Sequence, residues 1–257
     1  MFIRNERSIK EFVQLYPVVA TLVAINIVLY VFIDLIRLPI AVEFKFWGIG
    51  FNPAVTAGEY WRLITPIFLH GGLTHVLFNS FSLVLFGPAL EKMLGKVKFI
   101  LAYFGAGIAG NVGTYIMDPN SLTAHLGASG AIYGIFGIYM YMVAMRKDLI
   151  DQASTQIIVV IFLIGMVMTF IQPNINISAH VFGFLGGLAL APLMLIGVRA
   201  WSPWERRQPR RHDDGEVQFD PNRWQKKAKR KKIVTKVVWI IFGFLVLLGI
   251  LSRMNII

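Results

Sequence analysis

Cysteine is absent from the 257-residue sequence, and charged residues are few. The first absence excludes disulfides and thiolate metal sites, although it does not indicate a compartment. Only 15% of the residues are charged, whereas 56% are hydrophobic and the mean hydropathy is +0.63. An ordinary globular domain is about 45–50% apolar. The composition therefore predicts an integral membrane protein.

The alternation of apolar and polar residues that marks a membrane β-barrel is also lacking. Instead, the sequence has a series of apolar runs close to the about 20 residues that a helix needs to cross the hydrocarbon. We therefore predict an all-α fold, a polytopic membrane helical bundle. The predicted spans are residues 17–35, 73–90, 97–117, 127–145, 156–171, 177–198 and 233–251.

These spans divide the chain into four predicted segments. A cytoplasmic amino-terminal segment, 1–16, precedes a six-helix core, 17–198; a basic cytoplasmic loop, 199–232, leads to a seventh transmembrane helix with a short outer tail, 233–257. The first apolar run has no small-residue cleavage site after it, so we expect it to stay as an anchor. Residues 36–71, rich in glycine, proline and aromatics, are expected to form a long connection in the membrane interface.

Basic residues gather on one side of the predicted bundle. They precede the first span and occupy the connections after the second, fourth and sixth spans, the last of which carries the cluster 226–232. Since Lys and Arg accumulate in cytoplasmic loops, we predict a cytoplasmic amino terminus and an outer carboxy terminus. Attraction to anionic lipid, about 1 kcal/mol per basic residue near the surface, explains the cluster better than nucleic-acid binding. Topology thus accounts for the net charge of +11.

Three polar residues share one predicted depth in the membrane. His75, Ser129 and His180 each lie about three residues into the second, fourth and sixth spans. At about 1.5 Å of rise per residue, each is expected roughly 3–6 Å below the outer end of its helix. Ionisable residues within spans are costly and usually face a cavity or the bundle interior. We therefore interpret this level as a candidate functional site.

The helix ends add chemistry to this site. Ser129 lies among the unpaired N–H groups at the positive end of its helix, where a developing oxyanion would be stabilised. Asn79 follows His75 at i+4 and could donate to the same oxygen, and Tyr133 follows Ser129 at i+4, where its ring could hold an imidazole. His180 is then the natural general base. The second, fourth and sixth spans carry no Asp or Glu at this depth, so the sequence offers a Ser–His dyad at most.

Small residues at four-residue spacing predict close packing between the fourth and sixth spans. They are Gly127, Gly130, Gly134 and Gly137 in the fourth span, and Ala179, Gly183 and Gly187 in the sixth. Packing alone is the ordinary explanation of such glycines. The strand that a hydrolase nucleophile elbow requires is also missing before Gly127. Only the joint occurrence of Ser129, His75 and His180 at one depth favours catalysis.

The same residues resemble a known family, the rhomboid proteases. Residues 70–79, HGGLTHVLFN, resemble the rhomboid second-helix pattern; 127–130, GASG, the G-x-S-G motif; and 179–187, AHVFGFLGG, the sixth helix. Trp61-Arg62 resembles the Trp-Arg pair of the family's first loop, and Glu91 stands where the family has a glutamate at the inner end of helix two. The motifs follow the family's order from Trp61 to Gly187, and no motif position departs from the pattern.

The resemblance implies an intramembrane serine endopeptidase that cleaves in or near transmembrane segments of other proteins, without a cofactor or metal. Ser129 would be the nucleophile and His180 the base, and His75, Asn79 and the Ser129 N–H would form the oxyanion site. Supporting residues would be Tyr133, stacked on His180, and Gly127, Gly130, Gly183 and Gly187. His70 and Glu91 would be structural.

The resemblance also implies partners and a location. The partners would be transmembrane protein substrates and the lipid bilayer, with the fifth span and the 171–177 loop acting as gate and cap. The seventh span looks like the six-plus-one bacterial arrangement, which implies the bacterial plasma membrane.

Two other classes stay open at this stage. One is a non-catalytic rhomboid-like protein that binds transmembrane helices. The other is a transporter or channel, which is disfavoured because the sequence lacks an inverted repeat, a mid-span acidic residue and a pair of broken helices. The small-residue motifs permit a dimer without demanding one, so no oligomeric state, substrate or cleavage site is predicted.

Overall fold

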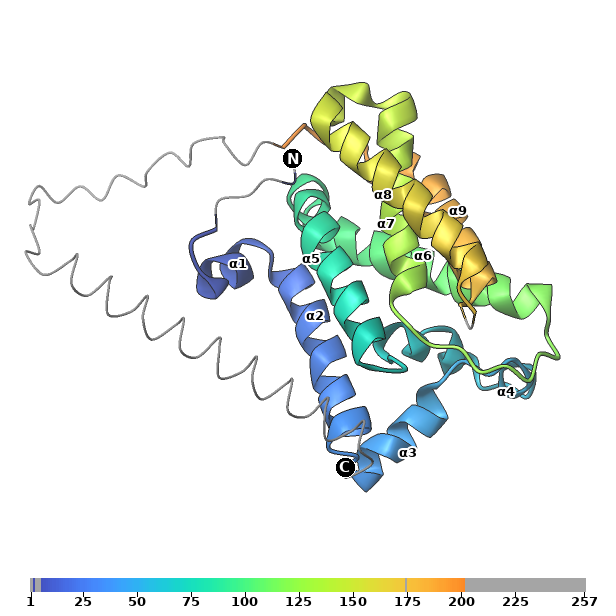
Figure 1. The fold of residues 1–257 in the computed structure, drawn as a ribbon. Coiled ribbons are helices and arrows are strands. Elements are labelled where there is room, and N and C mark those ends of the chain that lie inside the picture. The colour runs from blue at the N-terminus through green and yellow to red at the C-terminus, as the bar shows by residue number, and fades with distance from the viewer. Residues whose placement is uncertain (1, 3–5, 174, 202–257) are drawn as a thin grey trace, which may run out of the picture. The chain divides into compact units, whose positions relative to one another are not determined.

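The computed structural model describes residues 2, 6–173 and 175–201. Within these residues the chain is helical, and its one strand-like pairing is an isolated antiparallel bridge between Gly50 and His125 (Figure 1). Among them, five helices are long and apolar enough to cross a membrane, and a sixth apolar helix, Ser129–Met145, has 17 residues. The predicted polytopic helical bundle is confirmed. The predicted seventh span and nearly all of the basic loop 199–232 lie outside the described residues.

Each of the six predicted core spans coincides with a helix. The helices are α1 (Ile9–Leu15), α2 (Pro17–Tyr30), α3 (Pro39–Gly48), α4 (Asn52–Thr56), α5 (Leu73–Leu94), α6 (Lys96–Met117), α7 (Ser129–Met145), α8 (Gln152–Ile171) and α9 (Ile177–Met194). A π-helical turn, Val31–Leu35, continues α2, and 3-10 turns occupy Tyr60–Leu63, Thr65–Phe68 and Lys147–Leu149. The division of the chain into the segments 1–16, 17–198, 199–232 and 233–257 stays a prediction.

Helix boundaries differ from the predicted spans where single residues stop or start a helix. Helix α7 begins at Ser129 rather than at Gly127, because Gly127 has a φ of +135°, which an α-helix does not accept. Ser129 is therefore the first helical residue of α7 and not the third. Helix α8 begins four residues before its predicted start, because Asp151 caps it by accepting a hydrogen bond of 2.8 Å from the Ser154 N–H.

The connection over residues 36–71 is helical rather than a plain loop, and it lies at the end of the bundle where α5 begins (Figure 1). Prolines stand at the start of both α3 and α4, where a missing N–H costs nothing. Several of its aromatic side chains, including Phe46 and Trp47, are exposed. This exposure fits a segment that lies in the membrane interface.

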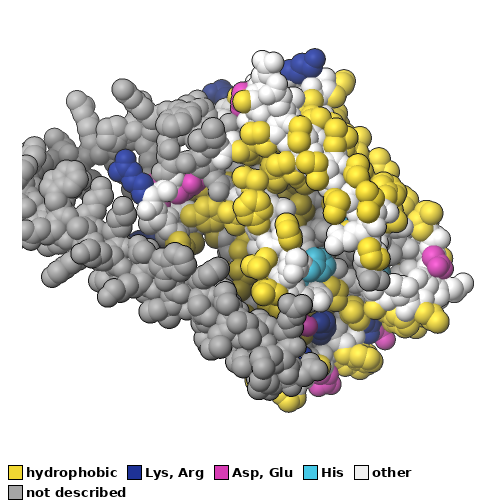
Figure 2. All heavy atoms as spheres, viewed as in Figure 1, with side chains coloured by type: hydrophobic (Ala, Val, Ile, Leu, Met, Phe, Trp, Pro, Cys, Tyr) yellow, Lys and Arg dark blue, Asp and Glu magenta, His cyan; other side chains and the backbone are white. Residues whose placement is uncertain are grey.

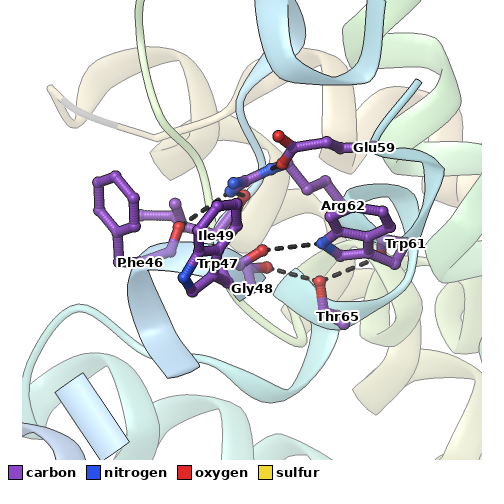
Figure 3. Close-up of polar contacts among 8 residues, drawn as sticks. All are labelled: Phe46, Trp47, Gly48, Ile49, Glu59, Trp61, Arg62 and Thr65. Carbon is purple, nitrogen blue, oxygen red and sulfur yellow. Dashed lines mark hydrogen bonds and ion pairs between the residues drawn. The ribbon is translucent and has the colours of Figure 1, made fainter. Parts of the chain in front are cut away.

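Three consecutive carbonyl groups at the end of α3 are satisfied by side chains that follow α4 (Figure 3). Arg62 donates to the Phe46 carbonyl, Trp61 to the Trp47 carbonyl and Thr65 to the Gly48 carbonyl, at 3.0, 3.0 and 2.6 Å. The last carbonyls of a helix have no partner within it, so these bonds replace the missing ones. The Trp-Arg pair thus ties the first connection into one unit.

Arg62 is itself buried, with 5% of its surface exposed. It also donates to the Ile49 carbonyl at 2.8 Å and forms an ion pair with Glu59. A buried cation is stable only when paired and hydrogen-bonded. These partners explain why an arginine is tolerated inside this connection.

Glu91, near the carboxy-terminal end of α5, is buried and caps α2. Its two carboxylate oxygens accept hydrogen bonds from the Val18 and Val19 N–H groups, at 3.0 and 2.9 Å. A carboxylate at a helix amino terminus satisfies unpaired donors and complements the helix dipole. The structural role predicted for Glu91 is confirmed.

Helices α7 and α9 approach each other along the predicted small residues. A Cβ atom added to Gly187 would lie 1.9 Å from the Gly134 carbonyl oxygen, and one added to Gly183 would lie 2.2 Å from the Gly130 carbonyl oxygen. No side chain fits in such a space, so glycine is required for this contact. The α7–α9 contact is a backbone-to-backbone interface.

Helix α8 is held much less closely. Its buried residues are Ser154, Ile158, Phe162 and Thr169, and most of its other side chains are apolar and exposed. Apolar side chains also cover much of the molecular face shown in Figure 2, where charged side chains are sparse. Exposed apolar surface of this extent is what lipid contact requires.

Candidate active site

Ser129 stands at the amino-terminal end of α7. No side chain caps this helix end, so its first N–H groups are available as donors. Gly127 bends the chain immediately before the helix, and a Cβ atom added there would lie 2.7 Å from His75 Nε2 and 3.5 Å from Ser129 Oγ. Gly127 therefore lies close to both the His75 ring and the Ser129 hydroxyl.

His180 is the fourth residue of α9 and is buried. The start of its helix is fixed by Asn176, whose side chain accepts a hydrogen bond of 2.9 Å from the Ala179 N–H and lies 3.1 Å from the Thr114 hydroxyl. The His180 ring stacks on Tyr133, with centroids 4.2 Å apart and planes inclined by 21°. This is the stacking that the resemblance to rhomboid proteases implies.

The α7–α9 interface brings Ser129 and His180 to the same level. A Cβ atom added to Gly130, the residue after Ser129, would lie 3.2 Å from the carbonyl oxygen of Ala179, the residue before His180. The Ser129 side chain makes no hydrogen bond to any described residue, His180 included. Catalytic hydrogen bonds are often long in enzymes without substrate. The backbone contact thus places the two residues at the same level of the interface, where the Ser129 hydroxyl makes no hydrogen bond to a described residue.

His75 and Asn79 lie on one face of α5. His75 Nδ1 accepts a hydrogen bond of 3.4 Å from the Gly71 N–H, so the proton of the neutral ring belongs on Nε2. That nitrogen is the one beside Gly127 and Ser129. Asn79 donates one amide N–H to the His75 carbonyl at 3.1 Å. Its second amide N–H makes no hydrogen bond to a described residue. Both side chains can therefore direct a hydrogen-bond donor toward the level of Ser129.

His70 lies outside this arrangement. It is buried in the turn before α5, and its ring meets that of His75 edge to face at 5.1 Å. Burial and then the neighbouring His75 lower the pKa of His70 to about 4. Burial likewise lowers the pKa of His125, in the loop before α7, to about 4. Both rings are neutral at physiological pH. Among the described residues no group of three His, Asp or Glu side chains is placed to hold a metal ion.

Thr169 is a site residue that sequence reasoning missed. It lies near the carboxy-terminal end of α8, is almost fully buried, and its hydroxyl oxygen lies 2.8 Å from His180 Nδ1 and 2.8 Å from the Tyr133 hydroxyl. The sequence carries one sign of its role: Thr169 is the only hydroxyl-bearing residue of the predicted span 156–171. A threonine in a membrane helix usually bonds its own backbone, so the sequence alone gives it no partner.

Comparison with known proteins places this geometry in a family. The Rhomboid domain model matches residues 57–197. YdcA of Bacillus subtilis, which bears the name of a rhomboid protease, is 48% identical over 191 residues. The matched residues are 74% of this chain and 94% of YdcA. The rhomboid protease GluP of B. subtilis is 38% identical over 146 residues, 56% of this chain and 28% of GluP. RHOMBOID-like protein 5 of Arabidopsis thaliana is 31% identical over 143 residues, 55% of this chain and 46% of that protein.

The matched segment contains all the site residues described above. The apolar helices agree with the family, since both indicate an integral, multi-pass membrane protein. Relatives named as proteases support an enzyme of this kind. The chain belongs to the rhomboid family.

Proposed function

We propose that this chain is an intramembrane serine endopeptidase that hydrolyses peptide bonds in or near transmembrane segments of membrane proteins. Ser129 is the nucleophile and His180 the general base. The observation that carries the proposal is the stacking of His180 on Tyr133 at the level where Gly130 packs on Ala179. This packing holds a buried imidazole beside a serine at an uncapped helix end, which is the geometry that nucleophilic catalysis needs.

In the first step, His180 Nε2 takes the proton of the Ser129 hydroxyl while Oγ bonds to the substrate carbonyl carbon. The carbonyl oxygen becomes an oxyanion, which accepts hydrogen bonds from the first N–H groups of α7, from His75 Nε2 and from the Asn79 amide. Fixed donors aimed at a developing charge are the strongest common source of catalysis. The two side-chain donors are the His75 Nε2–H and the second Asn79 amide N–H, which the hydrogen bonds of His75 Nδ1 and of the first Asn79 amide N–H leave available.

In the second step, the protonated His180 gives its proton to the leaving amine as the C–N bond breaks, and an ester with Ser129 remains. Water then attacks the ester carbonyl while His180 takes one of its protons. The Ser129 oxygen leaves and regains its proton from His180, which restores the enzyme. All proton transfers use Nε2 of one side chain.

Substrate reaches this site through the loosely held side of the bundle. Helix α8 and the 171–177 loop form the gate and cap, because α8 has few buried residues and exposes a largely apolar surface to lipid. A transmembrane substrate must unwind locally before its carbonyl is accessible. Segments with glycine or proline near the outer end are therefore preferred over uniformly helical leucine segments.

The proposed orientation places the amino terminus in the cytoplasm and the carboxy terminus outside, in the plasma membrane of a bacterium. The distribution of Lys and Arg supports it. In this orientation the beginning of α7, with Ser129, faces the outer side. The substrates are then cut near the outer ends of their transmembrane segments.

A second candidate is a non-catalytic rhomboid-like protein that binds transmembrane helices. One observation favours it: the Ser129 hydroxyl makes no hydrogen bond to His180 or to any other described residue. In that case the α7–α9 interface would serve only as a rigid frame. The serine would then show no enhanced reactivity.

Labelling with a fluorophosphonate probe separates the two candidates. The full-length protein is purified in detergent and labelled, and the modified residue is mapped by mass spectrometry beside Ser129→Ala and His180→Ala. We expect labelling on Ser129 alone, lost in both variants. A folded wild-type protein that neither reacts nor cleaves a model transmembrane substrate would support the binding protein instead.

A further inference from the structure

The Thr169 hydroxyl has three hydrogen-bonding neighbours and a single proton. Its oxygen lies 2.8 Å from the Gly165 carbonyl oxygen, 2.8 Å from the Tyr133 hydroxyl oxygen and 2.8 Å from His180 Nδ1. Thr169, Tyr133 and His180 are all buried, with 1%, 8% and 7% of their surfaces exposed. Buried polar groups of this kind need their hydrogen bonds satisfied within the protein.

The direction of these three bonds follows from their chemistry. A backbone carbonyl can only accept, so the 2.8 Å contact between the Thr169 hydroxyl oxygen and the Gly165 carbonyl oxygen is a hydrogen bond only if Thr169 donates. The two lone pairs of the hydroxyl oxygen are then free to accept from Tyr133 and from His180. With this arrangement Tyr133 donates its O–H, and His180 carries its proton on Nδ1. Every group in the network has a partner.

The opposite arrangement leaves one of the three 2.8 Å contacts, the one between the Thr169 and Gly165 oxygens, without a proton. If His180 carried its proton on Nε2, Nδ1 would be an acceptor and Thr169 would have to donate to it. The Gly165 carbonyl would then lose its side-chain partner, while Nε2 could no longer accept a proton from Ser129. A neutral imidazole has only these two tautomers, and the neighbour of one nitrogen decides which is present.

We propose that Thr169 is a positioning residue that holds the catalytic His180 in the Nδ1–H tautomer and fixes its ring orientation, as an uncharged third member of the catalytic group. This inference rests on the proposed function of Ser129 and His180. In serine proteases with a triad a carboxylate performs this task. Here a threonine hydroxyl performs it without placing a buried negative charge in the membrane, which would be costly.

The location of Thr169 gives the contact a further consequence. Thr169 belongs to α8, whereas His180 and Tyr133 belong to α9 and α7. Gly165, one turn earlier on α8, allows this approach, because a Cβ atom added there would lie 3.0 Å from the Tyr133 hydroxyl. The catalytic base is therefore oriented correctly only while the outer end of α8 is docked.

The first test reads the tautomer directly and does not require cleavage. The protein is labelled with ¹⁵N-histidine, and NMR in detergent micelles reports which ring nitrogen of His180 carries the proton, with His180→Gln assigning the signal. We expect the Nδ1–H form in the wild-type protein and in Thr169→Ser, and a mixture of tautomers in Thr169→Val. A wild-type His180 protonated on Nε2 would overturn the inference without any variant.

The second test compares cleavage kinetics of the same proteins on a transmembrane substrate. Thr169→Val should lower kcat about ten- to hundredfold with little change in KM, because a hydrogen bond to a charged imidazolium is lost. Thr169→Ser should recover most of the wild-type kcat. Thr155→Val is the matched control, since the Thr155 hydroxyl bonds only its own helix, at the Asp151 carbonyl, on the inner part of α8.

The outcomes distinguish this inference from the proposed function. An inactive wild-type protein with the Nδ1–H tautomer would contradict the protease and leave the network intact. An active wild-type protein whose kcat is unchanged in Thr169→Val, or equally low in Thr169→Ser and Thr169→Val, would overturn the role of Thr169. Thermal unfolding of each variant shows whether a low kcat reflects a misfolded protein. If Thr169→Val fails to fold, the wild-type tautomer and Thr169→Ser decide.

Discussion

Helices α7 and α8 both carry residues of the candidate site, but they are held to the bundle in different ways. Helix α7 meets α9 backbone to backbone, with no room for a Cβ atom at Gly183 or Gly187. In the part of the chain that the structure describes, helix α8 buries four side chains and exposes apolar ones along most of its length. The proposed nucleophile and base thus lie on the closely packed pair of helices, whereas the proposed gate is the loosely held helix.

The largest effect is expected from widening the α7–α9 contact. Gly187→Ala places a methyl group within 1.9 Å of the Gly134 carbonyl oxygen, so the helices must separate. We expect a loss of about 1–3 kcal/mol or more in the free energy of unfolding and about a hundredfold loss of cleavage, since small displacements at a site are costly. Gly105→Ala on α6 is the control, because only the flexible end of Leu190 lies 3.0 Å from the added atom. Equal behaviour of the two variants would contradict a rigid interface.

Lowering the pH should abolish activity through the base itself. His180 must be neutral to accept the Ser129 proton, so kcat/KM should fall about tenfold per pH unit once the pH drops below the imidazole range. Burial lowers the pKa of His70 to about 4, and His180 is buried in the same way, so the fall is expected below about pH 5. A profile measured from about pH 3.5 to about pH 8 checks this, and a profile that stays flat over the whole range would count against a histidine base.

A smaller effect is expected from loosening α8 further. Phe162 is one of its few buried residues and stacks on Phe184 of α9, with centroids 4.7 Å apart. Phe162→Ala loses an aromatic pair worth about 0.5–1.5 kcal/mol, which should raise the undocked population of α8 about two- to tenfold. Hydrogen exchange of α8 amides should speed up by that factor, with α7 unchanged. Phe170→Ala, at an exposed position, should leave exchange unaltered.

The smallest effect is expected in the turn that joins α7 to α8. Arg146 and Asp148 form an exposed ion pair of 2.8 Å there, and the hydrogen bond from Arg146 holds the pKa of Asp148 below its usual range. Exposed pairs contribute little to stability because solvent screens them. Asp148→Asn should leave both the melting temperature and the cleavage rate unchanged. A clear loss of either would mean that the turn, and not the glycine contact, links the two helices.

The positions of the long helices could be predicted from the sequence, because length and hydropathy alone determine which segments can span hydrocarbon. The short helices and turns could not be predicted in this way. Helix α3 is stabilised by side chains such as Arg62 and Trp61, which reach back to carbonyls more than ten residues away. The first turn of α7 was misplaced because nothing in the sequence shows that Gly127 has a positive φ.

The candidate site was predictable for a different reason. Ser129, His75 and His180 stand out because polar residues are rare in spans, and the resemblance to rhomboids assigned them roles. Thr169 did not stand out, because a hydroxyl can be satisfied by the carbonyl four residues earlier, as it is at Gly165. Only the folding of α8 against α7 and α9 reveals that the same oxygen also meets Tyr133 and His180.

The most direct test of the account is cleavage of a reconstituted transmembrane substrate by the wild-type protein and by Ser129→Ala. Both proteins are placed in liposomes with a substrate that carries a Gly-Pro pair near the outer end of its helix, and the products are mapped by mass spectrometry. We expect one cut near that end with the wild-type protein and none with Ser129→Ala. Cleavage by Ser129→Ala at the wild-type rate would contradict the assignment of the nucleophile, and with it the central claim.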